Sequence, residues 1–164
     1  MSRKYILDEN TVAKKLERMA LEIIENNLEE QELILIGIRD HGSVIAKAIE
    51  GYLQKLSSIR TKLIHFSLDK KHPGKVEISE EIDFTGKAII IVDDVTNSGK
   101  TMLYALQPLL PFYPKEIQTL ALVERSHKAF PVHTDYVGIS LATTLQDHIY
   151  VEVDGDRVTG AYII

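Results

Sequence analysis

The sequence contains no cysteine and no tryptophan. The lack of cysteine excludes a disulfide framework, thiol catalysis and cysteine-bound metal sites. The six histidines form no HxH or HxxxH pair, so a zinc site is not expected. No apolar run approaches the roughly 18 residues that a membrane-spanning helix needs, which predicts no membrane partner. The first ten residues are polar and lead into a helical pattern, so we expect no secretory signal and a cytoplasmic protein.

Basic charge is also scarce. The chain has 19 lysine and arginine residues against 24 aspartate and glutamate residues, which gives a formal net charge of −5 at pH 7. This balance disfavours a broad nucleic-acid-binding surface but allows a local basic patch. The chain has 164 residues, of which 45% are hydrophobic and 26% charged, as is typical of a globular protein. We therefore expect a single domain over residues 1–164.

The most informative stretch is Ala88–Thr101, with the sequence AIIIVDDVTNSGKT. Its Ile89–Val92 run is apolar and β-branched, which is typical of a central parallel strand that is covered on both faces. Asp93 and Asp94 follow where this strand is expected to leave the core, and the polar loop after them leads into a helix over 102–110. In open α/β sheets, ligands bind at the carboxyl ends of strands, and the beginning of a helix suits a phosphate.

This pattern predicts a site for a phosphorylated sugar. The carboxylates of Asp93 and Asp94 can accept hydrogen bonds from sugar hydroxyls or hold Mg²⁺, directly or through water. The alternative is a strand–turn–helix corner in which both aspartates only cap the helix and stay solvated. The loop that can surround a monoester phosphate with amides and hydroxyls consists of Thr96, Asn97, Ser98, Gly99, Lys100 and Thr101.

The segment Ser98–Thr101 also looks like the end of a nucleotide-binding P-loop. That motif requires a glycine five residues before its Gly-Lys pair. Asp94 occupies this position, so the sequence excludes a P-loop nucleoside triphosphatase.

A second strand–loop–helix pattern begins at Leu33–Ile38, a buried strand pattern that ends in Arg39-Asp40-His41-Gly42. Arg39 is a cation able to pair with phosphate, and Gly42 allows the backbone to approach a ligand closely. The alternative is an ordinary β–α turn capped by Asp40 or Ser43.

The remaining elements are read from periodicity and turn residues. Asp8 can cap a first helix, whose apolar face recurs at helical spacing from Val12 to Leu28. Asp154-Gly155 is a typical hairpin turn. The other expected strands are Thr61–Leu68, Ile117–Val123, Asp135–Leu141, Ile149–Val153 and Arg157–Ile163.

These features resemble the type I phosphoribosyltransferase family, whose hallmark is an apolar strand, an acidic pair and a loop that ends in Thr-Gly-x-Thr. Ile89–Val92, Asp93-Asp94 and Ser98–Thr101 fit this hallmark, with Thr96, Asn97 and Ser98 as departures from the usual residues. Within the family, the chain most resembles the bifunctional pyrimidine operon regulators and uracil phosphoribosyltransferases. That similarity covers Tyr5–Glu25, which resembles the opening helix of those relatives, as well as Leu35–Gly42 and Leu122–Val137.

The resemblance implies an α/β fold: a single domain with a central, mostly parallel, twisted sheet flanked by helices, a small hood and a C-terminal β-hairpin. It also implies a homodimer or higher homo-oligomer. The implied activity is transfer of the phosphoribosyl group of phosphoribosyl pyrophosphate to a nucleobase, with uracil favoured and Mg²⁺ as cofactor. The products are a nucleoside monophosphate and pyrophosphate.

The resemblance also implies a role for each candidate site residue. Asp93, Asp94 and Arg39 are the implied catalytic residues, and the two aspartates are the implied Mg²⁺ ligands. Thr96–Thr101 would hold the 5′-phosphate and Arg39–Gly42 the pyrophosphate. The base would be held by a turn formed by Val137, Gly138 and Ile139.

Two departures from the family keep other functions open. The uracil relatives carry a Tyr-Arg-Asp segment in a long loop, whereas this chain is shorter there and predicts a plain hairpin around Pro73-Gly74. A short loop suits a nucleotide-sensing, RNA-binding attenuation regulator with little turnover, or a vestigial fold that acts through a protein partner. RNA is a disfavoured partner because of the net charge. The basic residues that remain for RNA are Arg18, Arg125, His127 and Lys128.

Asn97 bears on the choice of base. It is neutral and stands where purine transferases carry an aspartate, which makes a purine substrate less favoured than a pyrimidine.

Overall fold

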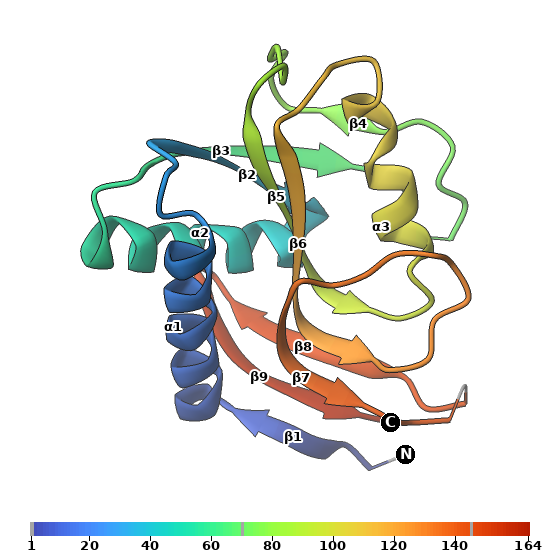
Figure 1. Cartoon of the computed structure of the whole chain (residues 1–164). Helices are drawn as coiled ribbons and strands as arrows, with labels where there is room; N and C mark the ends of the chain where they lie inside the picture. The colour runs from blue at the N-terminus through green and yellow to red at the C-terminus, as the bar shows by residue number, and fades with distance from the viewer. Residues whose placement is uncertain (1, 70, 145) are drawn as a thin grey trace.

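The computed structural model describes residues 2–69, 71–144 and 146–164. It contains a six-stranded sheet in the order β4-β3-β2-β5-β6-β7 and a three-stranded sheet in the order β1-β9-β8 (Figure 1). The elements are β1 (Lys4–Asp8), α1 (Glu9–Asn26), β2 (Glu32–Ile38), α2 (Arg39–Leu56), β3 (Arg60–Ser67), β4 (Glu77–Ile78), β5 (Ala88–Thr96), α3 (Lys100–Ala105), a 3₁₀ turn (Gln107–Leu109), β6 (Glu116–Arg125), β7 (Tyr136–Leu141), β8 (Ile149–Asp154) and β9 (Arg157–Ile163).

The larger sheet is parallel except at β4, which confirms the expected α/β fold. Strands β2 and β5 pair at its centre, with Ile34 opposite Ile89 and Gly37 opposite Val92. The continuous apolar runs follow from this position, because both faces of a central parallel strand are covered. The carboxyl ends of β2 and β5 therefore lie next to each other.

Alternate residues of β5 supply the two hydrophobic clusters on opposite faces of the sheet. Ile90 and Val92 pack with residues of α1 and α2, whereas Ile89 and Ile91 pack with Met102 and other residues of the α3 side. Figure 1 shows α1 and α2 on one side of the sheet and α3 on the other. Among the described residues, no helix is long and apolar enough to cross a membrane.

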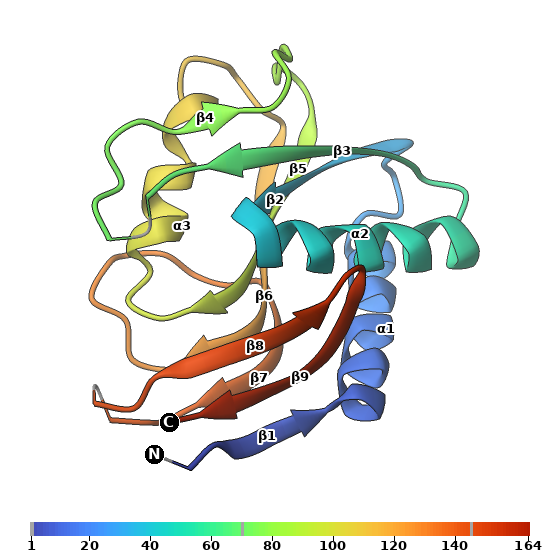
Figure 2. The same cartoon turned by 180° about the vertical axis from the view of Figure 1, so that it is seen from behind.

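The smaller sheet, called the hood sheet below, consists of β1, β9 and β8. The expected C-terminal hairpin is confirmed by the antiparallel β8 and β9, with Gly155 at φ 59° in the turn (Figure 2). The segment Tyr5–Glu25, which resembles the opening helix of the relatives, is helical only from Glu9, because Tyr5 lies in β1 opposite Tyr162. Strand β1 could not be read from sequence alone because its partner strand lies at the other end of the chain.

Helix α1 begins where the sequence predicts and ends earlier. Asp8 is its N-cap residue and accepts a 2.8 Å hydrogen bond from the amide of Thr11. The helix ends at Asn26, and Leu28 is 77% exposed instead of continuing the apolar face. Asn27 ends it, because its side-chain amide donates to the carbonyl of Ile23 at 2.7 Å.

Strand β5 extends further than expected. Asp93 and Asp94 lie within it and are only 1% and 9% exposed, so the prediction that they follow the strand at the edge of the core is wrong. The helix that follows is shorter than the expected helix over 102–110, because α3 ends at Ala105 and a 3₁₀ turn follows. Pro108 explains this break, since proline cannot supply the amide that an α-helix needs.

The region between β3 and β5 forms the short hairpin that the sequence predicts. Strand β4 contains two residues and pairs antiparallel with the end of β3, with Phe66 opposite Ile78 and Ser67 opposite Glu77.

Candidate active site at the carboxyl ends of the central strands

Gly42 allows the two predicted loops to meet. A Cβ atom at Gly42 would lie 2.7 Å from the carbonyl oxygen of Val92 and 3.2 Å from Cα of Asp93. Real Cβ atoms do not come that close, so only glycine lets the first turn of α2 press against β5. The glycine thus serves the packing of α2 against the neighbouring strand, and the close approach to a ligand stays a prediction.

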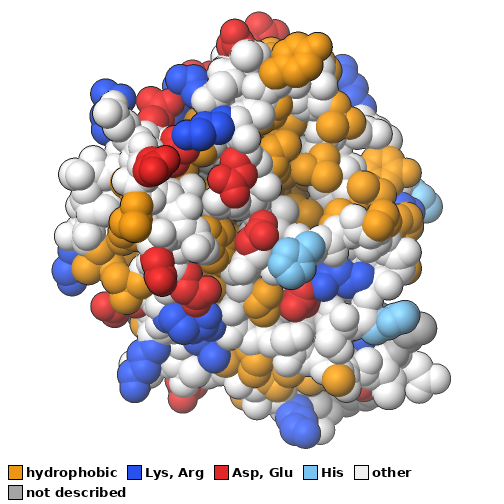
Figure 3. Space-filling view, in the orientation of Figure 1, with side chains coloured by type: hydrophobic (Ala, Val, Ile, Leu, Met, Phe, Trp, Pro, Cys, Tyr) orange, Lys and Arg blue, Asp and Glu red, His pale blue; other side chains and the backbone are white. Residues whose placement is uncertain are grey.

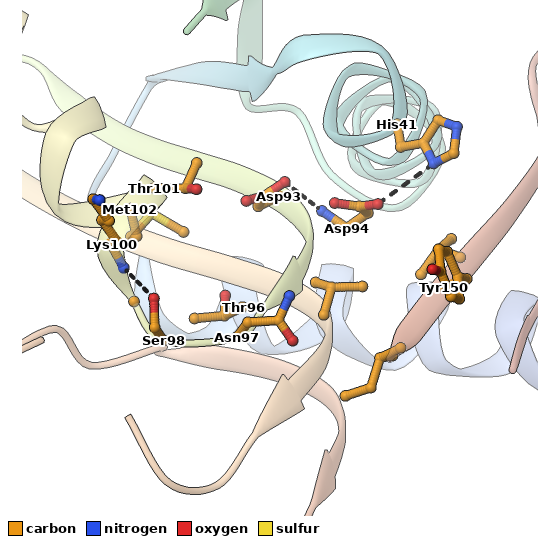
Figure 4. Close-up of a pocket in the computed structure, with 14 residues that line it drawn as sticks. His41, Asp93, Asp94, Thr96, Asn97, Ser98, Lys100, Thr101, Met102 and Tyr150 are labelled. Atoms are coloured by element: carbon orange, nitrogen blue, oxygen red, sulfur yellow. Dashed lines mark hydrogen bonds and ion pairs between the residues drawn. The ribbon is translucent and has the colours of Figure 1, made fainter. Parts of the chain in front are cut away.

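The acidic pair and the phosphate loop line one central cavity of about 320 Å³ (Figure 4). All of the residues from Asp93 to Met102 contribute to its wall, and His41 joins them from α2. Ile149, Tyr150 and Val151 of β8 complete the wall. No local sequence pattern predicts this contribution from the hood sheet, because it depends on how the smaller sheet packs against the end of β5.

The two aspartates are held in different ways. One carboxylate oxygen of Asp93 accepts a 2.9 Å hydrogen bond from the amide of Asp94. Oδ2 of Asp94 lies 3.4 Å from Nδ1 of His41. These contacts fix both carboxylates at the floor of the cavity (Figure 4).

The carboxylates of Asp93 and Asp94 are suitable ligands for Mg²⁺. Within the described part of the chain, no group of three or more histidine, aspartate and glutamate side chains is placed to hold a metal alone. Mg²⁺ is commonly bound by one or two carboxylates together with water and substrate phosphates. Asp93 and Asp94 match this mode, in which the substrate supplies most of the ligands.

The phosphate loop is shaped by Gly99 and held by the segment after β6. Gly99 has φ 87°, and a Cβ atom there would lie 2.5 Å from Cγ2 of Val132. The amides of Ala129 and Phe130 donate to the carbonyl of Ser98 at 3.0 and 3.1 Å. The loop is therefore preorganised around the space where α3 begins.

Thr96 carries an unusual feature for a residue at the start of this loop. Its side-chain hydroxyl is buried, with the residue 3% exposed, and has no hydrogen-bond partner among the described residues. Buried hydroxyls are normally paired, because an unpaired one loses its hydrogen bonds to water. Thr96 lines the central cavity (Figure 4), so we expect a ligand bound there to supply the missing partner.

The predicted pyrophosphate loop borders a second cavity of about 430 Å³. Arg39 has φ 50°, a left-handed conformation that is rare outside glycine, and its Nη1 donates to the carbonyl of Leu68 at 2.6 Å. The alternative of a turn capped by Asp40 or Ser43 is wrong, since Ile38 is the N-cap residue and no side chain caps the helix. The residues around this cavity are Ile38, Arg39, Asp40, His41, Asp69, Lys71 and Asp94.

A third cavity of about 650 Å³ adjoins the central one and shares Lys71 with the second. It shares Asn97, Ser98, Ile149 and Tyr150 with the central cavity, just as the second cavity shares His41 and Asp94 with it. The three cavities therefore adjoin one another at the carboxyl ends of the central strands. The third cavity is lined by Lys71, Asn97, Ser98, Arg125, His127, Ala129, Asp147, His148, Ile149 and Tyr150.

The expected turn at Val137, Gly138 and Ile139 is wrong, because these residues lie inside β7 at the edge of the sheet. A Cβ atom at Gly138 would lie 2.3 Å from the carbonyl oxygen of Leu122, so the glycine permits the pairing with β6. The carbonyls of Val137 and Gly138 accept hydrogen bonds from Nη2 of Arg18 at 3.0 and 2.9 Å.

Three of the basic residues that remained for RNA make contacts within the chain. Arg18 contacts the two carbonyls of β7 and the carboxylate of Glu22. Arg125 is buried and donates to the hydroxyl of Thr143 and to backbone carbonyls of the loop before β8. Lys128 pairs with Glu124. These contacts give the cations structural roles beside the site.

Comparison with known proteins gives consistent matches. The family model described as "Phosphoribosyl transferase domain" matches residues 2–155. The "Pyrimidine operon regulatory protein" of Lactococcus lactis subsp. lactis (strain IL1403) is 35% identical over 158 residues, which cover 93% of this chain and 91% of the relative. The "Bifunctional protein PyrR" of Streptococcus equi subsp. zooepidemicus (strain MGCS10565) is 35% identical over 170 residues, covering 97% of each chain.

Solved structures match the fold. A hypoxanthine-guanine phosphoribosyltransferase from Bacillus anthracis has a TM-score of 0.71 at 21% identity, covering 86% of this chain and 84% of its own. The hypoxanthine phosphoribosyltransferase of Trypanosoma cruzi has a TM-score of 0.75 at 14% identity, with 84% and 81% covered. At such low identity, these structures support the architecture alone.

Proposed function

The chain belongs to the type I phosphoribosyltransferase family, and on this premise we propose that it transfers the phosphoribosyl group of phosphoribosyl pyrophosphate to uracil. One observation carries the proposal: the central cavity adjoins the second cavity at Asp94 and the third cavity at Asn97. Such a site can take a substrate with two phosphorylated ends together with a flat acceptor. We propose that residues 1–164 act as a single domain in the cytoplasm.

The central cavity would hold the ribose 5-phosphate portion of the substrate. The amides and hydroxyls of Thr96–Thr101 would surround the 5′-phosphate, and Lys100 would add positive charge. Asp93 and Asp94 would accept hydrogen bonds from the ribose hydroxyls. Their burial holds the carboxylates in place before the substrate arrives, so little reorganisation accompanies binding.

The second cavity would hold the pyrophosphate, with Arg39 and the first turn of α2 around it. Mg²⁺, held by Asp94, by Asp93 or through water, would neutralise charge on this leaving group. The His41 side chain would contact both portions of the substrate, because it borders both cavities.

The third cavity would hold the base beside Ile149 and Tyr150, which border it together with Asn97. This proposal replaces Val137–Ile139 as the base site, because Arg18 occupies two of the carbonyls there. In the reaction, the bond between C1 of the ribose and the pyrophosphate oxygen breaks, and its electron pair leaves with pyrophosphate. N1 of uracil forms the new bond to C1 and loses its proton to the departing pyrophosphate. The site contributes mainly positioning and charge stabilisation.

The test is calorimetric titration of phosphoribosyl pyrophosphate with Mg²⁺ into the wild type and Asp94→Asn. We expect the wild type to bind and Asp94→Asn to bind at least about tenfold more weakly, since a hydrogen-bonded charge is lost. Asp156→Asn, an exposed change in the β8–β9 turn, serves as the control and should bind as the wild type. A uracil transfer assay then measures turnover. A wild type that does not bind would overturn the proposal.

A regulator that senses nucleotides and binds RNA is the second candidate, supported by the names of the relatives. The net charge of −5 and the internal contacts of Arg18, Arg125 and Lys128 weigh against it. Binding of a structured RNA that falls steeply with rising salt would favour the regulator. Uracil transfer without RNA binding would favour the enzyme.

We also propose that the protein forms a homodimer or higher homo-oligomer. Leu110 and Tyr113 are large exposed hydrophobic residues, and Figure 3 shows hydrophobic side chains gathered over the α3 side of the molecule. Patches of this kind commonly mark protein interfaces. Light scattering coupled to size-exclusion chromatography tests this assembly, and a monomer at micromolar concentration would contradict it.

A further inference from the structure

The side chain of His65, in β3, is hydrogen-bonded to the beginning of α2. His65 lies opposite Gly37 in the parallel pair of β2 and β3. A Cβ atom at Gly37 would lie 2.5 Å from Cα of Ser43, so only glycine leaves room for α2 at this point. Nδ1 of His65 therefore comes within 2.8 Å of Oγ of Ser43. The backbone of His65 is also held, because its amide donates to Oγ of Ser79 and its carbonyl accepts from the amide of Ser79, both at 2.9 Å.

Ser43 connects His65 to Arg39. The hydroxyl of Ser43 donates to the carbonyl of Arg39, one helical turn earlier. Because a hydroxyl has a single proton, Oγ of Ser43 accepts its other hydrogen bond, and Nδ1 of His65 is the donor. Two consecutive hydrogen bonds thus run from β3 to the backbone of Arg39.

The backbone of Arg39 needs such support. Among the residues that the structure describes, Arg39 is the only one besides glycines with a positive φ, at 50°. This left-handed conformation is unfavourable for a residue with a Cβ atom, and it persists where surrounding contacts hold it. The guanidinium of Arg39 is held by the carbonyl of Leu68 at 2.6 Å, and its carbonyl is held by Ser43. The two contacts together fix the residue at both its side chain and its backbone.

The carbonyl of Arg39 also sets the direction of the next amide. A peptide group is planar and trans, so the N–H of Asp40 points opposite to the carbonyl of Arg39. That carbonyl points along α2 toward Ser43, and the N–H of Asp40 therefore points out of the beginning of the helix. The first amides of a helix have no partner within it and suit an anion. Arg39, Asp40 and His41 line the second cavity, where the pyrophosphate is proposed to bind.

We infer that His65 and Ser43 are positioning residues, which hold Arg39 and the amide of Asp40 in the conformation that binds pyrophosphate. This inference rests on the proposed function and gives a role to two residues that line none of the three cavities. The competing explanation is a surface hydrogen bond between a histidine and a serine that stabilises the fold alone.

The experiment compares His65→Ala and Ser43→Ala with His133→Ala. His133 is an exposed histidine that lines none of the three cavities, which makes it a matched control. Each protein is titrated calorimetrically with pyrophosphate and Mg²⁺, with phosphoribosyl pyrophosphate and Mg²⁺, and with ribose 5-phosphate. We expect both test variants to bind the two pyrophosphate-containing ligands about fivefold more weakly, the effect of one neutral hydrogen bond. Their affinity for ribose 5-phosphate should stay within about twofold, and His133→Ala should match the wild type.

Two further variants separate positioning from general stability. His65→Asn keeps an amide nitrogen that can donate to Ser43 in place of Nδ1, so its pyrophosphate affinity should lie within about twofold of the wild type. The double variant His65→Ala, Ser43→Ala should bind pyrophosphate like Ser43→Ala, because His65 acts on Arg39 only through Ser43.

The other outcomes distinguish this inference from the proposed function. Unchanged pyrophosphate affinity in either alanine variant, with a wild type that binds, would overturn the inference and leave the proposed function intact. An equal loss for ribose 5-phosphate would also overturn the inference, because the effect would not be specific to pyrophosphate. His65→Asn that binds as weakly as His65→Ala would overturn it as well, since the hydrogen bond would not be what matters. Failure of the wild type to bind phosphoribosyl pyrophosphate would overturn both proposals.

Discussion

Nδ1 of His41 lies 3.4 Å from Oδ2 of Asp94, although the two residues come from different strand–loop–helix units. His41 lies in the first turn of α2, and Asp94 lies near the end of β5. Both residues border the central and the second cavity. The contact therefore sits at the junction between the proposed ribose and pyrophosphate positions, and it joins the two predicted loops into one site.

The first prediction is that His41 and Asp94 act together on substrate affinity. We expect His41→Ala and Asp94→Asn each to weaken the binding of phosphoribosyl pyrophosphate, and the double variant to lose less than the sum. For residues in contact, coupling energies are typically about 0.5–3 kcal/mol. Calorimetric titration of the four proteins measures the coupling. The pair His41→Ala and Asp156→Asn is the control and should be additive to within about 0.5 kcal/mol. Additive losses for His41 and Asp94 would contradict this prediction.

The second prediction concerns the buried hydroxyl of Thr96. Thr96→Val keeps the shape of the side chain and removes a hydroxyl that has no partner among the described residues. Leaving a buried polar group unpaired costs about 1–3 kcal/mol, so the unliganded variant should be more stable by up to that amount in urea unfolding. If the hydroxyl donates to a bound phosphate, the same variant should bind ribose 5-phosphate more weakly.

Thr134→Val provides the matched control for this experiment. Thr134 is also buried, at 4% exposed, and its hydroxyl also has no partner among the described residues, but it lines none of the three cavities. It should gain stability in the same way and keep its ribose 5-phosphate affinity. Equal affinities in the two variants would show that Thr96 has no role in binding.

The third prediction concerns Gly99, which is constrained both by its positive φ and by the side chain of Val132 next to it. Gly86→Ala and Gly99→Ala both place a side chain at positive φ, at 74° and 87°. That conformation costs an alanine about 1–2 kcal/mol. Gly86 has open space around its Cβ direction, whereas a Cβ at Gly99 would lie 2.5 Å from Val132. We expect Gly86→Ala to lose only the conformational amount, and Gly99→Ala to lose more stability and also phosphate affinity, as measured by urea unfolding and calorimetry. Equal stability losses would show that Val132 moves aside easily.

The sequence predicted those parts of the fold that depend on local pattern. The apolar run Ile89–Val92 identified the central strand, because burial on both faces leaves no polar position in it. Asp8 identified the start of α1 through its capping chemistry. The turn at Asp154-Gly155 identified the closing hairpin. Each of these signals lies within a few residues of the feature that it predicts.

The missed features depend on contacts between distant segments. Strand β1 forms because it pairs with β9, with Tyr5 opposite Tyr162, and no local sequence pattern predicts this distant pairing. Ile149 and Tyr150 reach the cavity because the hood sheet packs against the end of β5, which the alternation of β8 alone does not reveal. The sequence predicts a close approach of Gly42 to a ligand, whereas the structure shows its close approach to Val92 of the adjacent strand. Local sequence patterns thus predicted the loops that line the central cavity but could not predict the residues of the hood sheet that complete its wall.

The last prediction concerns Tyr136, which anchors β7 beside α1. Its hydroxyl donates to Oε1 of Gln118 at 2.8 Å, and Gln118 and Asn27 exchange hydrogen bonds at 3.1 and 3.2 Å. Tyr136→Phe removes this bond and the two long bonds of 3.4 Å that the hydroxyl accepts from the side-chain amides of Asn26 and Asn27, and it leaves the Gln118 oxygen paired with Asn27. We therefore expect a loss of about 1 kcal/mol in the free energy of unfolding at pH 7, measured in urea.

The pH dependence of this loss distinguishes the buried phenol from a surface one. Burial raises the pKa of Tyr136 above its ordinary value of 10.0, because the charged phenolate is poorly solvated inside the protein. The stabilisation from the neutral phenol is complete below pH 10 and is lost as the pH rises above it, since the unfolded chain then releases a proton that the folded chain retains. The difference between the wild type and Tyr136→Phe should therefore narrow above pH 10. Tyr113→Phe, at an exposed position, should follow the wild type at every pH. A constant difference between Tyr136→Phe and the wild type across this range would show that the phenol titrates alike in the folded and unfolded chains.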